Sequence, residues 1–141
     1  MELKHEKESS INADIIYKHI GLQVIEEDID SFYIDILGFE PIRTIQLSEE
    51  ESKDIFDINR KVSILYGSCR GLDMELFVSD LPRIPTYNHI CIQTMFPQDM
   101  LSAAIFKGYK TFSRRKNGSK TVFISDSNHN VFEVKAGSTK S

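Results

Sequence analysis

The chain has 141 residues, of which 40% are hydrophobic and 27% are charged, and its formal net charge is −4. This length predicts one domain with a substantial core, and the composition excludes general disorder. The acidic balance argues against nucleic acid as the main partner, and no apolar run is long enough to span a membrane. The first residues lack the apolar stretch of a signal peptide, and two cysteines do not make a disulfide framework, so we expect a cytoplasmic protein.

The sequence contains an internal repeat. Residues 17–24 read YKHIGLQV and residues 87–94 read YNHICIQT, at an offset of 70 residues. A second match sets Glu75 in MELF against Glu133 in FEV, at an offset of 58 residues. The shorter second offset indicates that the first half carries 12 additional residues, which we place between Leu47 and Arg60. Two copies with this long a period predict a duplicated supersecondary unit.

Each half is predicted to form a strand, a helix and three further strands. Apolar spacing predicts strands at 17–24, 39–46, 62–66 and 72–78 with a helix at 26–37, and strands at 87–94, 110–115, 120–125 and 130–135 with a helix at 97–107. Gly38 and Gly108 end the helices, Pro41 indicates an edge strand, and Asn117-Gly118 predicts a hairpin turn. The expected organisation is a tail at 1–16, one domain at 17–135 (module one 17–80, linker 81–86, module two 87–135) and a tail at 136–141.

Strand alternation gives each half one histidine and one glutamate on the face opposite its apolar residues. These side chains are His19 and Glu75 in the first half, and His89 and Glu133 in the second. If the two sheets wrap around a shared cavity, the four groups converge, and such nitrogen and oxygen donors suit divalent Zn, Ni, Co, Mn or Fe. A lone histidine or glutamate on a polar strand face is usually solvated. Repetition of the same pair in both halves favours a metal site.

These segments resemble the vicinal oxygen chelate superfamily, which includes glyoxalase I, methylmalonyl-CoA epimerase, extradiol dioxygenases and fosfomycin- or bleomycin-resistance proteins. The resemblance is carried by HIGLQV at 19–24, FY at 32–33, LGF at 37–39, MELF at 74–77, HICI at 89–92 and FEV at 132–134. It implies an α+β fold in which two βαβββ modules form an incomplete barrel around the metal. It also implies a homodimer, with sites either within one chain or between two.

The ligand set bears on the activity that the resemblance implies. Dioxygenase and fosfomycin-type members use a His, His, Glu set, whereas the additional Glu75 makes this chain similar to glyoxalase I and close to methylmalonyl-CoA epimerase. The implied activity is that of a lyase or isomerase. A divalent metal would stabilise an enediolate while Glu133 or Glu75 moves a proton next to the carbonyl of a small-molecule substrate. The alternatives are a non-haem iron dioxygenase and a protein that binds a small molecule or antibiotic without turnover.

Five further residues are candidates for substrate binding. Gln23, Gln93 and Cys91 share the strand faces of the predicted ligands, although filler roles explain them equally well. We expect Cys91 to be a small buried thiol rather than a nucleophile. Arg43 and Arg114 could meet an anionic group of the substrate, while surface solubility is the more common role of such residues.

Overall fold

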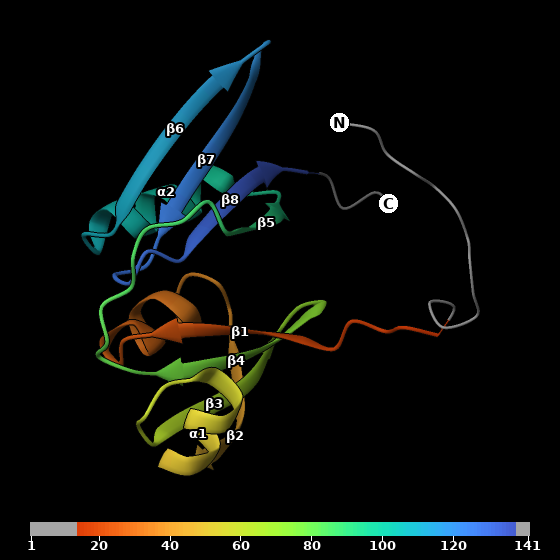
Figure 1. Ribbon diagram of the computed structural model, residues 1–141. Coiled ribbons are helices and arrows are strands. Elements are labelled where there is room, and N and C mark those ends of the chain that lie inside the picture. Colours follow the sequence, from red (N-terminus) through yellow and green to blue (C-terminus); the bar gives the residue numbers. More distant parts are fainter. Residues whose placement is uncertain (1–13, 138–141) are drawn as a thin grey trace, which may run out of the picture.

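The computed structural model describes residues 14–137 and contains two four-stranded sheets, one from each predicted module (Figure 1). Most of the predicted tails, 1–16 and 136–141, lies outside the described residues. The first module comprises β1 (His19–Val24), η2 (Ile29–Ile34), β2 (Glu40–Leu47), α1 (Glu49–Phe56), β3 (Val62–Cys69) and β4 (Leu72–Val78). The second comprises β5 (His89–Thr94), α2 (Pro97–Phe106), β6 (Lys110–Lys116), β7 (Ser119–Ser125) and β8 (Val131–Ala136).

The two sheets have the same topology. Their strand orders are β1-β4-β3-β2 and β5-β8-β7-β6, and neither sheet closes into a barrel. The first strand of each module runs parallel to the last, and the other neighbouring strands are antiparallel. The predicted α+β fold of two βαβββ modules is therefore confirmed.

Local sequence signals fix the ends and edges of the strands. Pro41 lies on the edge strand β2, as predicted, where its missing N–H costs no ladder hydrogen bond, and the register shifts between Pro41 and Arg43. Asn117 and Gly118 have φ values of 54° and 78°, as the tight turn between β6 and β7 requires. Within residues 14–137, no helix has both the length and the apolar character needed to cross a membrane.

The structure refines one predicted helix and adds another. The helix predicted at 26–37 is a π-helical segment in which the Asp35 N–H donates to the Asp30 carbonyl, five residues back. The predicted insertion contains the additional helix α1. Ser48 and Glu51 form a reciprocal capping box at its start, which explains why this charged segment becomes a helix rather than a loop.

The two modules share one hydrophobic core. Phe32 of η2 contacts Phe132 of β8 at a ring-centroid distance of 5.6 Å, and Leu101 and Ala104 of α2 belong to the same buried cluster. The apolar faces of both sheets supply the rest of this core, through Val24, Met74, Leu76, Val122, Ile124 and Val134. Each sheet therefore turns its helix-covered face toward the other module, and its opposite face points away.

A buried polar network ties the turn between β7 and β8 to the first module. The Tyr33 hydroxyl donates to the Asp126 carboxylate at 2.6 Å, and Asp126 also accepts from the backbone N–H groups of Asn128 and Asn130 at 2.9 Å. The side-chain amides of Asn128 and Asn130 donate to the Gln23 carbonyl of β1. Burial and the Asp126 charge raise the pKa of Tyr33, so its phenol remains a donor.

Candidate functional site

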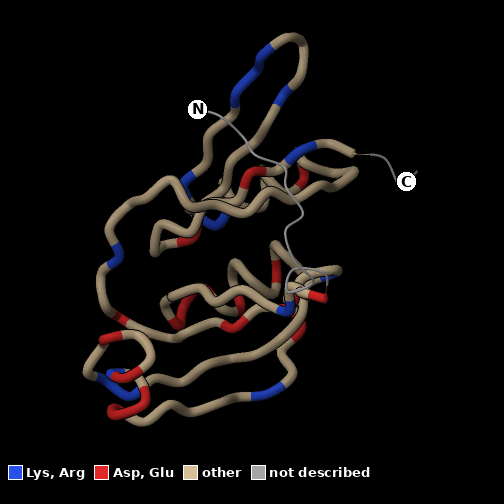
Figure 2. The backbone as a smooth tube through the Cα atoms, turned by 45° about the vertical axis from the view of Figure 1, so that its right-hand side comes forward, with Lys and Arg blue, Asp and Glu red and all other residues tan. Residues whose placement is uncertain are grey.

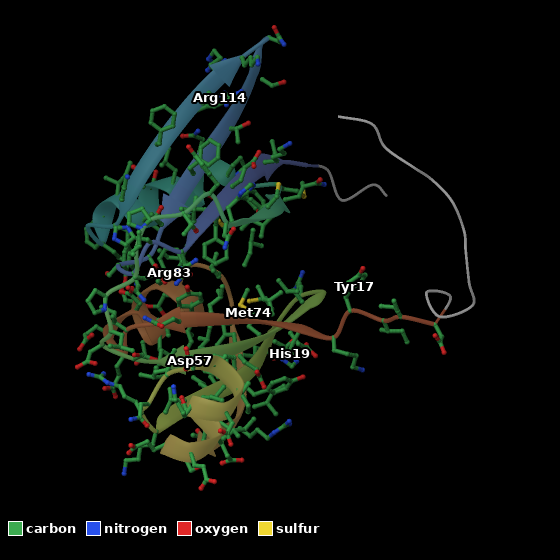
Figure 3. The ribbon with its side chains drawn as sticks, in the orientation of Figure 1. Tyr17, His19, Asp57, Met74, Arg83 and Arg114 are labelled. Carbon is green, nitrogen blue, oxygen red and sulfur yellow. The ribbon has the colours of Figure 1, made fainter. Side chains whose placement is uncertain are left out.

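The first predicted pair lies on the face of the first sheet that points away from the other module, which we call the free face of that sheet. His19 begins β1 (Figure 3). Glu75 lies on the parallel neighbour β4, and His19 Nε2 is 3.1 Å from Glu75 Oε1. The ring of Tyr66, on β3, stands perpendicular to the His19 ring at 6.3 Å. The side chains of His19 and Glu75 are 41% and 20% exposed, so the pair is open to solvent on one side.

The second pair repeats this arrangement on β5 and β8. His89 Nε2 is 3.2 Å from Glu133 Oε1, with side chains 46% and 20% exposed. The other ring nitrogen, His89 Nδ1, lies 3.0 Å from the Tyr87 carbonyl oxygen. Since a carbonyl oxygen can only accept, Nδ1 carries a proton, and a neutral ring then directs the Nε2 lone pair at Glu133.

This geometry fits a divalent cation. A lone pair and a carboxylate oxygen facing each other at about 3 Å need a proton or a cation between them. A backbone carbonyl on the far nitrogen is the usual partner that orients a metal-binding imidazole. The donors His19, Glu75, His89 and Glu133 are thus suitable ligands for the predicted metal.

The structure brings the four predicted ligands together as two pairs and not as one cluster. Among residues 14–137, no group of three or more His, Cys, Asp or Glu side chains could hold a metal ion. The reason is the shared core: the helix-covered faces of the sheets meet there, so the faces that carry the pairs point away from each other. The sheets of one chain do not wrap around a common cavity. We call each His–Glu pair with its surroundings a half-site: His19 and Glu75 form the first, and His89 and Glu133 the second.

The surroundings of the first half-site are polar. Tyr66 donates from its hydroxyl to Asp73 at 2.8 Å, and this hydrogen bond raises the pKa of Tyr66. The guanidinium of Arg43 lies over the Tyr66 ring, 4.4 Å from its centroid. Arg43, predicted as an anion-binding residue, is therefore held beside Tyr66 on the face that carries His19 and Glu75.

The second half-site lies in a basic cavity of about 500 Å³. Arg114, Lys116 and Lys135 line it together with His89 and Glu133. Lys135 Nζ is 3.6 Å from Glu133 Oε2. The whole β6–β7 hairpin next to this cavity is basic: it carries Lys and Arg residues and no acidic ones (Figure 2). Arg114 therefore lies next to the predicted metal ligands, as an anion-binding role requires.

The remaining candidates take different positions. Gln23 donates from its amide to the Leu81 carbonyl at 2.7 Å, which ties β1 to the linker. Gln93 packs against the backbone of Gly137. Cys91 lies directly opposite Glu133 in the β5–β8 register and is exposed, so the expectation of a buried thiol is wrong. A residue at this position of β5 points to the free face, which no helix covers.

Sequence reasoning missed several neighbours of the half-sites. Tyr66 and Asp73 were not singled out, although alternation along β3 and β4 places both on the free face with Glu75. Lys116 was missed because the strand β6 extends one residue beyond its predicted end. A cross-strand register, had it been assigned, would have found all three.

No family model and no curated protein matches the chain. Solved structures do match its fold. The fosfomycin resistance protein FosX from Listeria monocytogenes aligns over 89% of this chain and 96% of its own, with a TM-score of 0.68 and 18% identity. A glyoxalase family protein from Enterococcus faecalis aligns over 86% and 97%, with a TM-score of 0.63 and 19% identity. These proteins belong to the vicinal oxygen chelate superfamily.

The chain has the vicinal oxygen chelate fold. The resemblance stated from the sequence is thereby confirmed at the level of the fold. A FosX variant from Listeria monocytogenes, with 20% identity and a TM-score of 0.67 over 88% of this chain and 94% of its own, was solved with Mn(II) and 1S,2S-dihydroxypropylphosphonic acid. A protein with the vicinal oxygen chelate fold thus binds a divalent metal together with a small organic anion.

Proposed function

We propose that this protein is a divalent-metal-dependent enzyme that moves a proton next to a carbonyl group of a small-molecule substrate. Each active site would combine His19 and Glu75 of one copy with His89 and Glu133 of a second copy. The observation that carries this proposal is the duplicated pair, with nearly equal distances of 3.1 Å and 3.2 Å between imidazole nitrogen and carboxylate oxygen.

The equivalence of the two glutamates supports a four-donor site. Glu75 lies about as far from His19 as Glu133 lies from His89, which supports a role for each carboxylate as a ligand of the same ion as its histidine. This is the pattern that resembles glyoxalase I and methylmalonyl-CoA epimerase. The metal would act as a Lewis acid toward the substrate oxygens. Glu133, with Glu75 as its counterpart, would accept the substrate proton and return it.

Two features support a site between two copies. The free face of each sheet carries one half-site and is open to solvent, while the helix-covered faces are consumed by the core. A two-fold axis that sets the first sheet of one chain against the second sheet of another would create two identical, complete sites. The predicted homodimer would then be required for activity.

Mixing two half-site variants tests this arrangement. His19→Ala damages the first half-site and His89→Ala the second, so neither homodimer keeps an intact set of ligands. A heterodimer of the two variants would contain one intact site and one doubly damaged site. With random pairing, the mixture should recover about a quarter of the wild-type Mn(II) binding and activity.

The readouts are Mn(II) titration and exchange of the carbon-bound hydrogens of hydroxyacetone in D2O, followed by NMR. Hydroxyacetone has the neighbouring carbonyl and hydroxyl oxygens that the proposed reaction needs. No recovery in the mixture, or full Mn(II) binding by either variant alone, would contradict a site shared between chains. Glu133→Gln should abolish exchange in every preparation.

A second candidate is modification of a phosphonate antibiotic such as fosfomycin. The observation that favours it is the basic cavity around His89 and Glu133, because Arg114, Lys116 and Lys135 suit a phosphonate group. The structural similarity to FosX points the same way. The test is to incubate the protein with fosfomycin and Mn(II) and to monitor the antibiotic by phosphorus NMR. Disappearance of the fosfomycin signal would favour this function over proton transfer on a carbonyl compound.

A further inference from the structure

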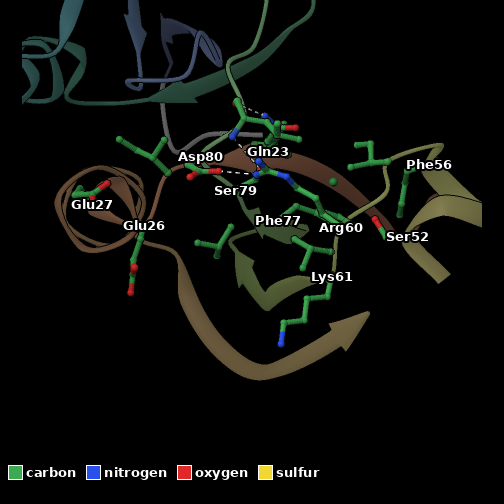
Figure 4. A pocket seen from close by; sticks show the side chains of 17 residues that line it. Gln23, Glu26, Glu27, Ser52, Phe56, Arg60, Lys61, Phe77, Ser79 and Asp80 are labelled. Atoms are coloured by element: carbon green, nitrogen blue, oxygen red, sulfur yellow. Dashed lines mark hydrogen bonds and ion pairs between the residues drawn. The ribbon is translucent and has the colours of Figure 1, made fainter. Parts of the chain in front are cut away.

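A cavity of about 680 Å³ opens on the free face of the first sheet, at the end of β1 away from His19 (Figure 4). We infer that it is a substrate subsite that binds an apolar, ring-sized group, so that the substrate is a carbonyl compound with an aromatic or bulky aliphatic substituent. The inference rests on the proposed function and names its substrate class. The volume lies within the range of small-molecule sites.

Aromatic side chains form the walls of this cavity. Phe56 at the end of α1 and Phe77 of β4 lie edge to face, with ring centroids 5.2 Å apart. Gly21 of β1 lies beside them, and a Cβ placed there would come within 3.0 Å of the Phe77 ring. The Phe77 ring therefore already lies over Gly21, where a larger residue would collide with it, and a flat apolar group can pack against Phe77 and Phe56 from the cavity side.

The polar groups at the cavity already have partners. The Gln23 amide donates to the Leu81 carbonyl, and Arg60 pairs with Asp80 at 2.8 Å, which lowers the pKa of that carboxyl group. The other charged residues at the rim, Glu26, Glu27 and Lys61, are exposed to water. Because no buried charge is left unpaired, the cavity favours an apolar group over a second anion.

The cavity lies next to the first half-site along β1 and β4. Gly21 lies directly opposite Glu75 in the β1–β4 register, and Phe77 is the next residue of β4 on the same face. Two residues along a strand span about 7 Å. A carbonyl held beside His19 and Glu75 would therefore carry its substituent along the Phe77 ring and into the cavity.

The corresponding cavity of the second module is lined mainly by basic and polar residues in place of these aromatic walls. Cys91 and Lys135 take the places of Gly21 and Phe77, and a tight turn at Asn117-Gly118 takes the place of α1. The 12 additional residues of the first half thus supply one wall of the subsite, through Phe56. This gives the inserted helix a role in substrate choice.

The experiment compares benzylacetone (4-phenylbutan-2-one) with butanone, which lacks the ring, as probes of the full-length protein by amide NMR. Benzylacetone should shift the amides of Gly21 and Phe56 and bind at least about tenfold more tightly than butanone, because its ring is buried. Phe56→Ala and Gly21→Leu should each weaken benzylacetone binding by about tenfold, the first by removing a wall and the second by colliding with the Phe77 ring. Ile55→Ala removes a neighbouring exposed side chain of α1 outside the cavity, and it should leave binding unchanged.

Mn(II) titration of the same samples separates this inference from the proposed function. Benzylacetone binding that depends on Phe56 and Gly21 would support the subsite even if Mn(II) did not bind, and the metal proposal would then fail alone. Equal binding of the two ketones, or equal effects of Phe56→Ala and Ile55→Ala, would overturn the subsite even if Mn(II) binds as expected.

Discussion

The two modules have the same strands and the same histidine–glutamate pair, yet the free faces around the pairs have opposite polarity. In the first module, the positions beside His19 hold Arg43, Tyr66 and Asp73. The strand register places Phe112, Phe123 and Val131 at the corresponding positions of the second module. Two residues beyond the glutamate, the polarity is reversed: the first module has the apolar Phe77, and the second has the basic Lys135 and, across the sheet, Arg114.

This inversion shows which part of the duplicated unit is constrained. The pair needs a parallel first and last strand, and both modules keep this geometry to within 0.1 Å in the nitrogen–oxygen distance. The neighbouring positions on the same face touch no common core, so each module can carry its own chemistry there. The first module offers an apolar cavity and the second offers a basic one.

The largest expected effect comes from the turn that joins the modules. The first module connects β3 and β4 by the tight turn Arg70–Gly71, whereas the second connects β7 and β8 by the polar segment 126–130. Asp126→Ala should lower the free energy of unfolding by about 3–5 kcal/mol, because four donors of the buried network lose their acceptor. Urea denaturation measures this, and Asp80→Ala, at a highly exposed carboxylate, should leave the free energy of unfolding nearly unchanged. Similar losses for both variants would show that the turn does not join the modules.

Glutamine substitutions test whether the two His–Glu pairs contribute equally to metal binding. Glu75→Gln and Glu133→Gln should each weaken Mn(II) binding by at least about 100-fold, since loss of a direct ligand exceeds the 10- to 100-fold effect of an outer partner. Calorimetric titration with Mn(II) measures both. Retention of wild-type affinity by Glu75→Gln alone would indicate a His, His, Glu set, as in the dioxygenase and fosfomycin-type reading.

The polarity of the second free face is tested with a small anion. Arg114→Ala should raise the dissociation constant for methylphosphonate by about fivefold, because one charge-assisted contact is lost from the cavity. Arg115→Ala is the matched control, since alternation along β6 places Arg115 on the other face and it does not line the cavity. Arg115→Ala should leave the dissociation constant nearly unchanged, and the effect of Arg114→Ala should shrink as salt is added. Equal effects of the two variants would mean that general surface charge, and not this face, attracts the anion.

The smallest effect concerns the helix that the second module lacks. Ser48→Ala removes the capping box of α1 and should lower the free energy of unfolding by about 1 kcal/mol. Ser102→Ala, in the interior of α2 and exposed, should change it by less than about 0.5 kcal/mol. Urea denaturation compares the two. A Ser48→Ala protein as stable as wild type would show that α1 is held by packing and not by its cap.

The sequence was sufficient for the fold because its signals were local and repeated. The alternating strands, the glycines at helix ends and the Asn117-Gly118 turn all predicted features that the structure contains. The pairing of His19 with Glu75 followed from the duplication, although the strands are 56 positions apart. Local patterns could not show how the modules face each other. That depends on Phe32 packing against Phe132 and on the Tyr33–Asp126 hydrogen bond, which join segments about a hundred residues apart.

The buried network between the modules holds them together without relying on the linker at residues 81–86. Asp126, Asn128 and Asn130 hold the first module by hydrogen bonds that do not pass through residues 81–86. We therefore expect the halves to stay together when the backbone is cut between Arg83 and Ile84 after the core has formed. The gene could be split at that point into two fragments that reassociate without a covalent bond, and each half-site could then be altered on its own fragment.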